Sequence, residues 1–170
     1  MPRLHVCSLA LIADTVEKTG ARSLLTLLSP GTPVERPGAI RPERHLYLAI
    51  SDIVAPTPGQ ILPHRAHLDD LIAFVRRWDR AEPMLIHCYA GVSRSTAAAF
   101  IAACALKPGR DEFEIAGALR AASPTATPNA RLVALADAAL GRRGRMNEAI
   151  AGIGRGEECV EGTPFALELG

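Results

Sequence analysis

One short stretch of this sequence combines a nucleophile with groups that bind anions. Residues 84–96 read MLIHCYAGVSRST, so Cys88 follows a short apolar run and Arg94 comes soon after it. The residues between them are mostly small, and the chain then becomes apolar on every side from Ala97 to Leu106. This pattern predicts a buried strand, a tight loop and a buried helix.

A loop in this position is suited to binding an anion. Backbone N–H groups at the start of a helix have no partner within the helix, and the helix dipole also attracts negative charge. Gly91 would let the backbone curl closely around the anion, and the guanidinium of Arg94 could bind two phosphate oxygens at once. The same donors would stabilise a thiolate at Cys88. The sequence therefore predicts a sulfur nucleophile facing a phosphate-binding loop, as phosphoryl transfer requires.

The string HCYAGVSRS resembles the active-site signature of the cysteine-dependent protein tyrosine phosphatases, and within them most closely the compact dual-specificity type. The resemblance covers roughly residues 1–141, although only the signature is specific. It implies that Cys88 attacks phosphorus and forms a cysteinyl-phosphate intermediate. It also implies that Arg94 binds the phosphate and stabilises the transferring group. The alternatives are a small buried cysteine and an ordinary arginine at a helix start.

The other residues of the predicted catalytic loop, 87–95, would assist these two. Ser95 could donate its hydroxyl to the sulfur and ease departure of the thiolate, or it could cap the following helix. His87 would orient the loop from behind, in a role close to that of an ordinary core histidine. The residues that would bind the substrate through backbone donors, beside Arg94, are Tyr89, Ala90, Gly91, Val92 and Ser93.

Two positions outside the signature extend the resemblance. Asp52 follows a predicted strand and precedes the Pro- and Gly-containing segment 55–59, at about the distance upstream of the cysteine where this family keeps its general acid. The alternative for Asp52 is a residue that forms a loop or turn. Pro128-Asn129 falls where many dual-specificity phosphatases carry a Pro-Asn pair opening a late helix. Asn129 is therefore expected to support the site without reacting.

The rest of the chain supplies elements that could position these residues. Helical spacing predicts a helix after Ser8 and another from Arg65, followed by helices that begin near Asp111 and Asn129 and a weak one over 146–153. The predicted strands are 4–7, 23–28, 46–50, 84–87 and a terminal edge strand over 165–169. This order predicts an α/β fold with a central mixed, largely parallel sheet flanked by helices, as in the dual-specificity phosphatases. We expect one phosphatase domain, 1–170, in which 142–170 is a tail that matches nothing recognisable.

Composition and charge exclude several other classes of protein. The chain has 170 residues and is 48% hydrophobic, which suits one globular domain and argues against disorder. A formal net charge of +1 argues against the usual basic nucleic-acid-binding protein. No stretch is predicted to span a membrane or to be a signal peptide.

The cysteines and histidines favour a reduced compartment and no metal. Cys7, Cys88, Cys104 and Cys159 form neither a disulfide framework nor a zinc pattern, so a cytoplasmic location is expected. His64 and His67 are spaced for one helix face, but no third ligand accompanies them, and a solvated face is the simpler interpretation. We expect no metal and no other cofactor.

The predicted function is hydrolysis of phosphotyrosine in proteins, with phosphoserine and phosphothreonine as further candidate substrates. The expected partners are a phosphorylated protein or peptide, with phosphate, sulfate or vanadate as active-site ligands, and neither nucleic acid nor membrane. A phosphoinositide or inositol phosphate phosphatase is the first alternative, although such enzymes often carry lysines in the loop and YAGVS has none. A phosphate-binding pseudophosphatase that serves as an interaction module is the second. A sulfurtransferase of the rhodanese type is the third, but its loop lacks the His-Cys and Ser-Arg-Ser arrangement.

Overall fold

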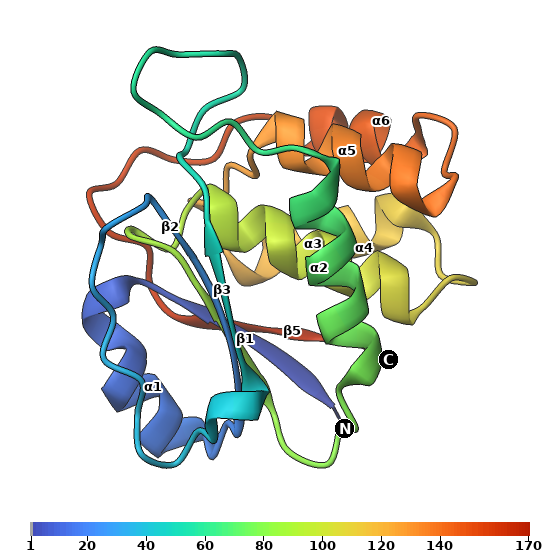
Figure 1. Ribbon diagram of the computed structural model, residues 1–170. Coiled ribbons are helices and arrows are strands. Elements are labelled where there is room, and N and C mark those ends of the chain that lie inside the picture. Colours follow the sequence, from blue (N-terminus) through green and yellow to red (C-terminus); the bar gives the residue numbers. More distant parts are fainter. Residues whose placement is uncertain (1) are drawn as a thin grey trace.

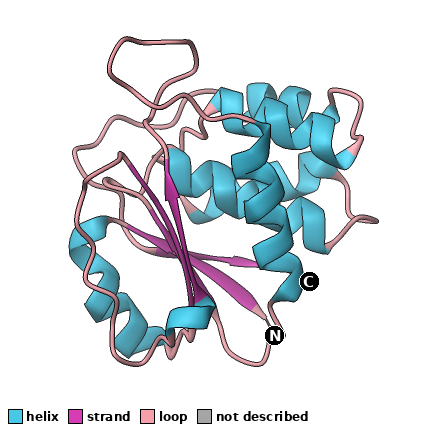
Figure 2. Cartoon of the chain, in the orientation of Figure 1, coloured by secondary structure: helices cyan, strands magenta, loops and turns pink. Residues whose placement is uncertain are grey.

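The computed structural model describes residues 2–170 and contains one five-stranded sheet with helices on both faces (Figures 1 and 2). The strand order is β3-β2-β4-β1-β5, where the first four strands are parallel and β5 is antiparallel to β1. The strands are β1 (Arg3–Cys7), β2 (Ser23–Leu28), β3 (His45–Ala49), β4 (Met84–His87) and β5 (Phe165–Glu168). The predicted mixed, largely parallel sheet and its terminal edge strand are confirmed.

The two strands at the centre of the sheet are apolar along almost their whole length. Every residue of β2, SLLTLL, and of β4, MLIH, is buried. Strands that are covered on both faces show such continuous apolar runs, whereas half-exposed strands alternate. Apart from Ser23 at the start of β2, the polar exceptions are Thr26 in β2 and His87 in β4, which are partners in the register of the two strands.

Helices cover the two faces of the sheet unequally. Figure 1 shows α1 alone on one face, with the helices from α2 onward gathered on the other. The helices are α1 (Ile12–Thr19), α2 (Arg65–Arg77), α3 (Arg94–Leu106), α4 (Glu112–Ala122), α5 (Ala130–Leu140) and α6 (Arg145–Ile153). Two short 3₁₀ turns, η1 (Leu9–Leu11) and η2 (Pro42–Arg44), precede α1 and β3. Each predicted helix is present, and the tail contains α6 and β5.

Helix α3 is the centre of the larger core. All of its residues are buried, including Arg94, Ser95 and Thr96 in the first turn. It begins at Arg94, earlier than the apolar run alone indicates, and it packs against the sheet and against α2, α4 and α5. A helix enclosed on all sides holds its N-terminus, and therefore the preceding loop, in a fixed position.

Two expectations about helix starts need adjustment. Ser8 precedes η1, but its hydroxyl caps no helix and instead donates a hydrogen bond to Glu161. His64 is exposed and His67 is half-buried, and the two form a reciprocal cap at the start of α2, because each ring accepts a backbone N–H. Within residues 2–170, no helix is both long and apolar enough to cross a membrane.

Candidate active site

The Cys88 loop and the Asp52 loop meet at one edge of the sheet. β3 and β4 both run parallel to β2, so the segments that follow them leave from the same edge. The first of these segments carries Asp52 and the second carries Cys88. Ser93 Oγ donates a hydrogen bond of 2.7 Å to Asp52 Oδ1, which joins the two loops directly. The structure thus brings together the predicted nucleophile loop and the predicted acid.

The loop from Cys88 to Ser93 is tied to the protein by its own carbonyl groups. Backbone or ring N–H groups donate to these carbonyls at 2.8–3.2 Å. The pairs are His87 Nδ1 to Cys88, Leu9 N to Tyr89, Gly162 N to Ala90, Thr127 N to Val92, and Asn129 N to Ser93. In a trans peptide the N–H points away from the C=O. Because each of these carbonyls is held on one side, the N–H of the following residue points toward the opposite side of the loop, where an anion would bind.

Gly91 makes the tight curl of this loop possible. Its φ of +73° lies in the left-handed region, which other residues rarely adopt. A Cβ at this position would also lie 2.9 Å from the carbonyl carbon of Cys7, closer than such contacts normally come. The role predicted for Gly91 thus has two physical causes, the backbone conformation and the close approach of β1.

Arg94 is the first residue of α3, and its side chain reaches the segment that follows β3. Its Nη1 donates to the backbone carbonyl of Ile50 at 2.9 Å, and the residue is only 7% exposed. Its Nε is the one buried side-chain nitrogen or oxygen without a hydrogen-bond partner in residues 2–170. A buried N–H donor without a partner is energetically unfavourable. The chemistry of this donor fits an oxyanion that binds between Arg94 and the loop.

Cys88 and Ser95 are in direct contact at the base of the loop. Cys88 is 2% exposed, and its Sγ lies 3.1 Å from Ser95 Oγ. Ser95 lies inside the first turn of α3, so it does not occupy the N-cap position. Its hydroxyl can donate to a thiolate at Cys88. The geometry favours the interaction with sulfur over the alternative of a helix cap.

A line of polar side chains runs behind the loop from His87 to β3. His87 Nδ1 lies 3.0 Å from the carbonyl oxygen of Cys88, and Thr26 Oγ1 lies 2.8 Å from both His87 Nε2 and His45 Nε2. Because a carbonyl can only accept, His87 Nδ1 carries a proton and donates. Burial lowers the pKa of His87 to about 4, so the neutral ring uses Nε2 to accept from the Thr26 hydroxyl. His45 Nε2–H then donates to Thr26, which fixes every direction in this chain of hydrogen bonds.

Asp52 is held in place by Asn129 as well as by Ser93. Asn129 Nδ2 donates to Asp52 Oδ1 at 2.9 Å and to the carbonyl of Ile53 at 3.2 Å. Asn129 Oδ1 at the same time accepts the N–H groups of Arg131 and Leu132, which confirms it as the cap of α5. One amide thus links the start of a helix to the Asp52 carboxylate, as expected for a supporting residue.

An open pocket of about 510 Å³ adjoins these residues. It lies between the segment after β3 and the start of α5, and Ser93 of the loop after β4 borders it. Its lining residues are Asp52, Ile53, Val54, Ala55, Thr57, Ser93, Thr127, Pro128, Asn129 and Ala130. None of these side chains is basic, so the pocket would favour an apolar or neutral group.

The cysteines other than Cys88 differ in accessibility. All four are free thiols, and Cys159 is exposed. Burial raises the pKa of Cys7 to about 12, with a further contribution from the nearby Cys88, and burial raises that of Cys104 to about 12 as well. Cys7 lies opposite His87 in the register of β1 and β4. Both buried thiols should therefore be poor nucleophiles at neutral pH.

Sequence reasoning missed Thr26, His45 and the residues around Gly162. Thr26 could have been identified from the sequence, because it is the single polar residue between the leucines of a buried strand. His45 also precedes an apolar run, but nothing in the sequence pairs it with Thr26. Gly162 contacts the loop through its backbone N–H, and a backbone contact cannot be recognised from the residue type. In the described part of the chain, no three His, Cys, Asp or Glu side chains are grouped so as to hold a metal ion.

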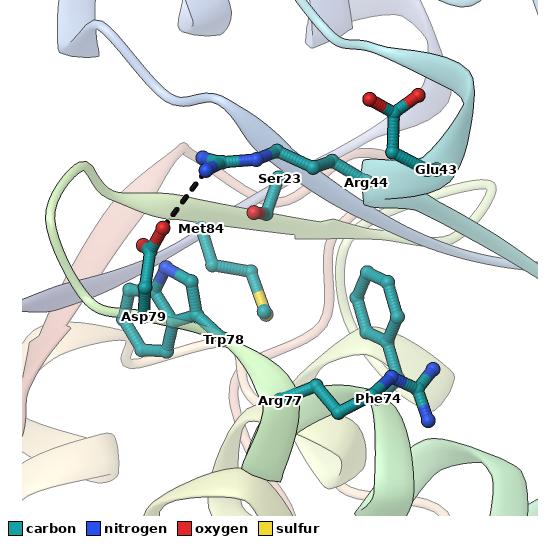
Figure 3. Close-up of a pocket in the computed structure, with 8 residues that line it drawn as sticks. All are labelled: Ser23, Glu43, Arg44, Phe74, Arg77, Trp78, Asp79 and Met84. Atoms are coloured by element: carbon teal, nitrogen blue, oxygen red, sulfur yellow. Dashed lines mark hydrogen bonds and ion pairs between the residues drawn. The ribbon is translucent and has the colours of Figure 1, made fainter.

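A second hollow lies at the opposite edge of the sheet (Figure 3). Its volume is about 100 Å³, and it is bordered by Ser23 and Met84, which begin β2 and β4. Arg44 crosses one side of it and pairs with Asp79, as Figure 3 shows. None of the predicted site residues lines this hollow.

Comparison with known proteins gives matches in structure only. The sequence matches no protein-family model and has no significant match among curated proteins. A mouse dual specificity phosphatase, solved as a complex with zinc tungstate, aligns with a TM-score of 0.62 and 20% identity over 86% of each chain. Human DUSP28 aligns with a TM-score of 0.61 and 20% identity over 88% of this chain and 94% of its own. The Cydia pomonella PTP-2 phosphatase aligns with a TM-score of 0.61 and 20% identity over 79% of this chain and 84% of its own.

These alignments show that the chain has the fold of the compact dual-specificity phosphatases. The predicted fold class is confirmed, and the resemblance first seen in a nine-residue signature extends to the architecture of most of the chain. At 20% identity, the alignments establish the fold alone, and the activity has to be inferred from this chain's own site.

Proposed function

We propose that this protein is a phosphatase that hydrolyses phosphate monoesters through Cys88, with phosphotyrosine in proteins or peptides as its preferred substrate. The observation that carries this proposal is the buried, unpartnered Nε of Arg94, directly after a loop in which five carbonyls are bound by groups outside the loop. Such a site would supply donors to a tetrahedral oxyanion, next to the sulfur atom of Cys88 at the start of the loop. The tungstate complex of the mouse neighbour is in keeping with this, because tungstate is also a tetrahedral oxyanion.

In the first step, the Cys88 thiolate attacks phosphorus and the bond from phosphorus to the ester oxygen breaks. The negative charge on the transferring group is stabilised by Arg94 and by the inward N–H groups of the loop. Asp52 donates a proton to the leaving oxygen, which departs as a phenol or alcohol. The products of this step are the dephosphorylated side chain and a phosphate bound covalently to Cys88.

In the second step, water attacks the same phosphorus and the bond to sulfur breaks. Asp52, now a carboxylate, accepts the proton that the water loses. Ser95 Oγ, at 3.1 Å from Cys88 Sγ, donates a hydrogen bond to the departing thiolate. Inorganic phosphate leaves, and both Cys88 and Asp52 return to their initial protonation states.

The surroundings of the site support an aromatic substrate over a phosphoinositide. A second phosphate on an inositol ring would need a cation beside the loop, but the pocket next to Asp52 is lined by no Lys, Arg or His. Ile53, Val54 and Pro128 of that pocket present apolar surface instead. A tyrosine ring beside its phosphate is compatible with this lining. Phosphoserine and phosphothreonine are further candidate substrates. The proposal also includes a cytoplasmic location and catalysis without a cofactor.

Turnover of p-nitrophenyl phosphate by the full chain tests the proposal. We expect hydrolysis that persists in EDTA, is inhibited by vanadate and is lost in Cys88→Ser. A parallel assay with thiosulfate and cyanide tests sulfur transfer, and vanadate binding without turnover would identify a pseudophosphatase. A panel of phosphotyrosine, phosphoserine and phosphothreonine peptides and inositol phosphates then determines the substrate class. Turnover restricted to inositol phosphates would contradict the proposed substrate.

A further inference from the structure

The segment between α6 and β5 crosses the phosphate-binding loop. In Figure 1 the chain leaves α6, runs to the left of the view and returns as β5. We call residues 155–162 the C-terminal strap. At its start, Gly156 N donates to Thr127 Oγ1 at 3.1 Å and Glu157 N donates to the carbonyl of Pro124 at 3.0 Å. At its end, Gly162 N donates to the carbonyl of Ala90 at 2.8 Å, inside the phosphate-binding loop.

Gly162 lies against the loop too closely for any other residue. A Cβ on Gly162 would be 2.8 Å from the carbonyl oxygen of Gly91 and 3.4 Å from that of Ala90. A Cβ on Gly91 would in turn lie 2.9 Å from the carbonyl carbon of Cys7 and 3.0 Å from the backbone nitrogen of Ser8. The Ala90–Gly91 peptide is therefore enclosed between the end of β1 and the strap.

Glu161 fastens this end of the strap to the same part of β1. The hydroxyl of Ser8, which is 1% exposed, donates a hydrogen bond to the Glu161 carboxylate. Ser8 directly follows β1, whose last residue, Cys7, leaves no room for a Cβ on Gly91. The Ser8–Glu161 hydrogen bond thus fixes the position from which Gly162 reaches the loop.

The consequence for the site follows from peptide geometry. The Ala90 carbonyl is the one loop carbonyl bound by the strap, and the N–H of the same peptide belongs to Gly91. Because the two groups point in opposite directions, holding the carbonyl on Gly162 directs the Gly91 N–H toward the oxyanion. A donor oriented in advance needs no rearrangement when the phosphoryl group is transferred.

We propose that Glu161 and Gly162 are positioning residues of the phosphate-binding loop, acting on the substrate through the Ala90–Gly91 peptide. This inference rests on the proposed function of that loop. It assigns a catalytic purpose to the tail of the chain, which carries none of the signature residues. A strap that only stabilised the fold would affect unfolding but not phosphate affinity in the folded protein.

The test compares Gly162→Ala with Gly152→Ala, since a Cβ on Gly152 in α6 meets no atom within 4 Å. Phosphate affinity is measured through protection of Cys88 against iodoacetate, in a Cys159→Ser background that removes the exposed thiol. Removal of one oxyanion donor typically lowers kcat by about a hundredfold or more. For a displaced donor we expect Gly162→Ala to lose about tenfold or more in kcat and in phosphate affinity, while Gly152→Ala matches the wild type.

Glu161 provides a second pair of variants that avoids a steric clash. Glu161→Gln keeps an oxygen that accepts from Ser8 and should retain wild-type kcat and phosphate affinity, whereas Glu161→Ala should lose both by several-fold. Glu158→Ala, an exposed carboxylate of the same strap, is the matched control. Circular dichroism establishes that each variant is folded at the assay temperature. If Gly162→Ala does not fold, the Glu161 pair decides the outcome.

Two results would overturn the inference. One is a folded Gly162→Ala or Glu161→Ala protein with wild-type kcat and phosphate affinity, and the other is an equal loss in the control variants. Failure of the proposed function looks different, because the wild type itself would then bind phosphate at Cys88 without hydrolysing p-nitrophenyl phosphate. In that case the phosphate affinities alone decide the role of the strap.

Discussion

Each of the two edges of the parallel sheet carries an arginine, Arg44 at one and Arg94 at the other. The two arginines differ in the hydrogen-bond partners of their side-chain nitrogens. At the edge where β2 and β4 begin, Arg44 is paired with Asp79 at 2.8 Å and with Glu82 at 3.2 Å, and a hollow of about 100 Å³ remains beside it (Figure 3). At the edge where the strands end, Arg94 has one nitrogen bound to a backbone carbonyl and another without a partner.

This difference shows that a hollow alone does not make a site. The loop after β4 has its carbonyls tied outward, so its N–H groups are directed toward a common space, and the start of α3 adds its dipole there. At the opposite edge, both terminal nitrogens of the Arg44 guanidinium are already bound to carboxylates. Variants at each edge can break or sharpen the comparison.

Arg94→Lys should have the largest effect. Lysine keeps the charge but lacks the Nε–H and the planar fork that fit two oxygens of one phosphate. We expect kcat/KM for p-nitrophenyl phosphate to fall by about a thousandfold, near the upper end for the loss of an oxyanion donor. Arg44→Lys, at the opposite edge, is the matched control and should keep wild-type activity. Activity of Arg94→Lys within tenfold of the wild type would contradict the assignment.

His87 should make the stability of the protein depend on pH. Its pKa is lowered from 6.5 to about 4 by burial, so between these values the unfolded chain binds a proton that the folded chain does not. The free energy of unfolding should therefore fall as pH is lowered from 6.5 to 4, by about 3 kcal/mol from this residue. Urea unfolding across this range measures the slope, which should be shallower in His87→Asn. Equal slopes in both proteins would show that His87 does not carry the effect.

Asp52→Asn distinguishes a general acid from a loop-forming aspartate. The amide can still accept hydrogen bonds from Ser93 and Asn129 but cannot transfer a proton. We expect a loss of about a hundredfold with a phosphotyrosine peptide, and a smaller loss with an aryl phosphate whose leaving group is already acidic. The alkaline limb of the pH–rate profile should flatten. An equal loss on both substrates, with the alkaline limb unchanged, would assign the proton to another group.

The sequence was sufficient for the parts of the site that depend on residue type and local spacing. Cys88, Gly91 and Arg94 lie within one short stretch, and Asp52 follows a strand whose direction the order of elements predicts. The hydrogen bonds of Gly162 to Ala90 and of Ser8 to Glu161 could not be predicted in this way. They join segments far apart in the chain, and backbone atoms or common polar side chains form them. Burial of Thr26 beside His87 likewise emerges only from the strand register.

Thr26→Val tests the line of hydrogen bonds behind the loop. Valine has a similar shape but leaves His87 Nε2 without its donor, which should lower the free energy of unfolding by about 1–2 kcal/mol. Because His87 also holds the Cys88 carbonyl, we expect kcat to fall by several-fold and the rate of Cys88 alkylation to change. A variant with wild-type kcat and alkylation rate would limit Thr26 to a structural role.

Arg44→Gln should have the smallest effect. Arg44, Asp79 and Glu82 are all partly exposed, and such ion pairs contribute less than about 1 kcal/mol. We expect a slightly lower free energy of unfolding, measured in urea, and unchanged kcat and KM. A large loss of activity would mean that the opposite edge of the sheet influences the chemistry, which would remove the contrast between the two edges.

The most direct test of the central claim is to isolate the phosphorylated enzyme. A phosphotyrosine peptide is mixed with the protein and quenched rapidly, and the digested chain is analysed by mass spectrometry for phosphate on the peptide that contains Cys88. Phosphate on Cys88 in the wild type, and none in Cys88→Ser, is the predicted result. Rapid substrate turnover with phosphate on a different residue, or with Cys88→Ser fully active, would contradict the proposal that Cys88 in this loop is the nucleophile.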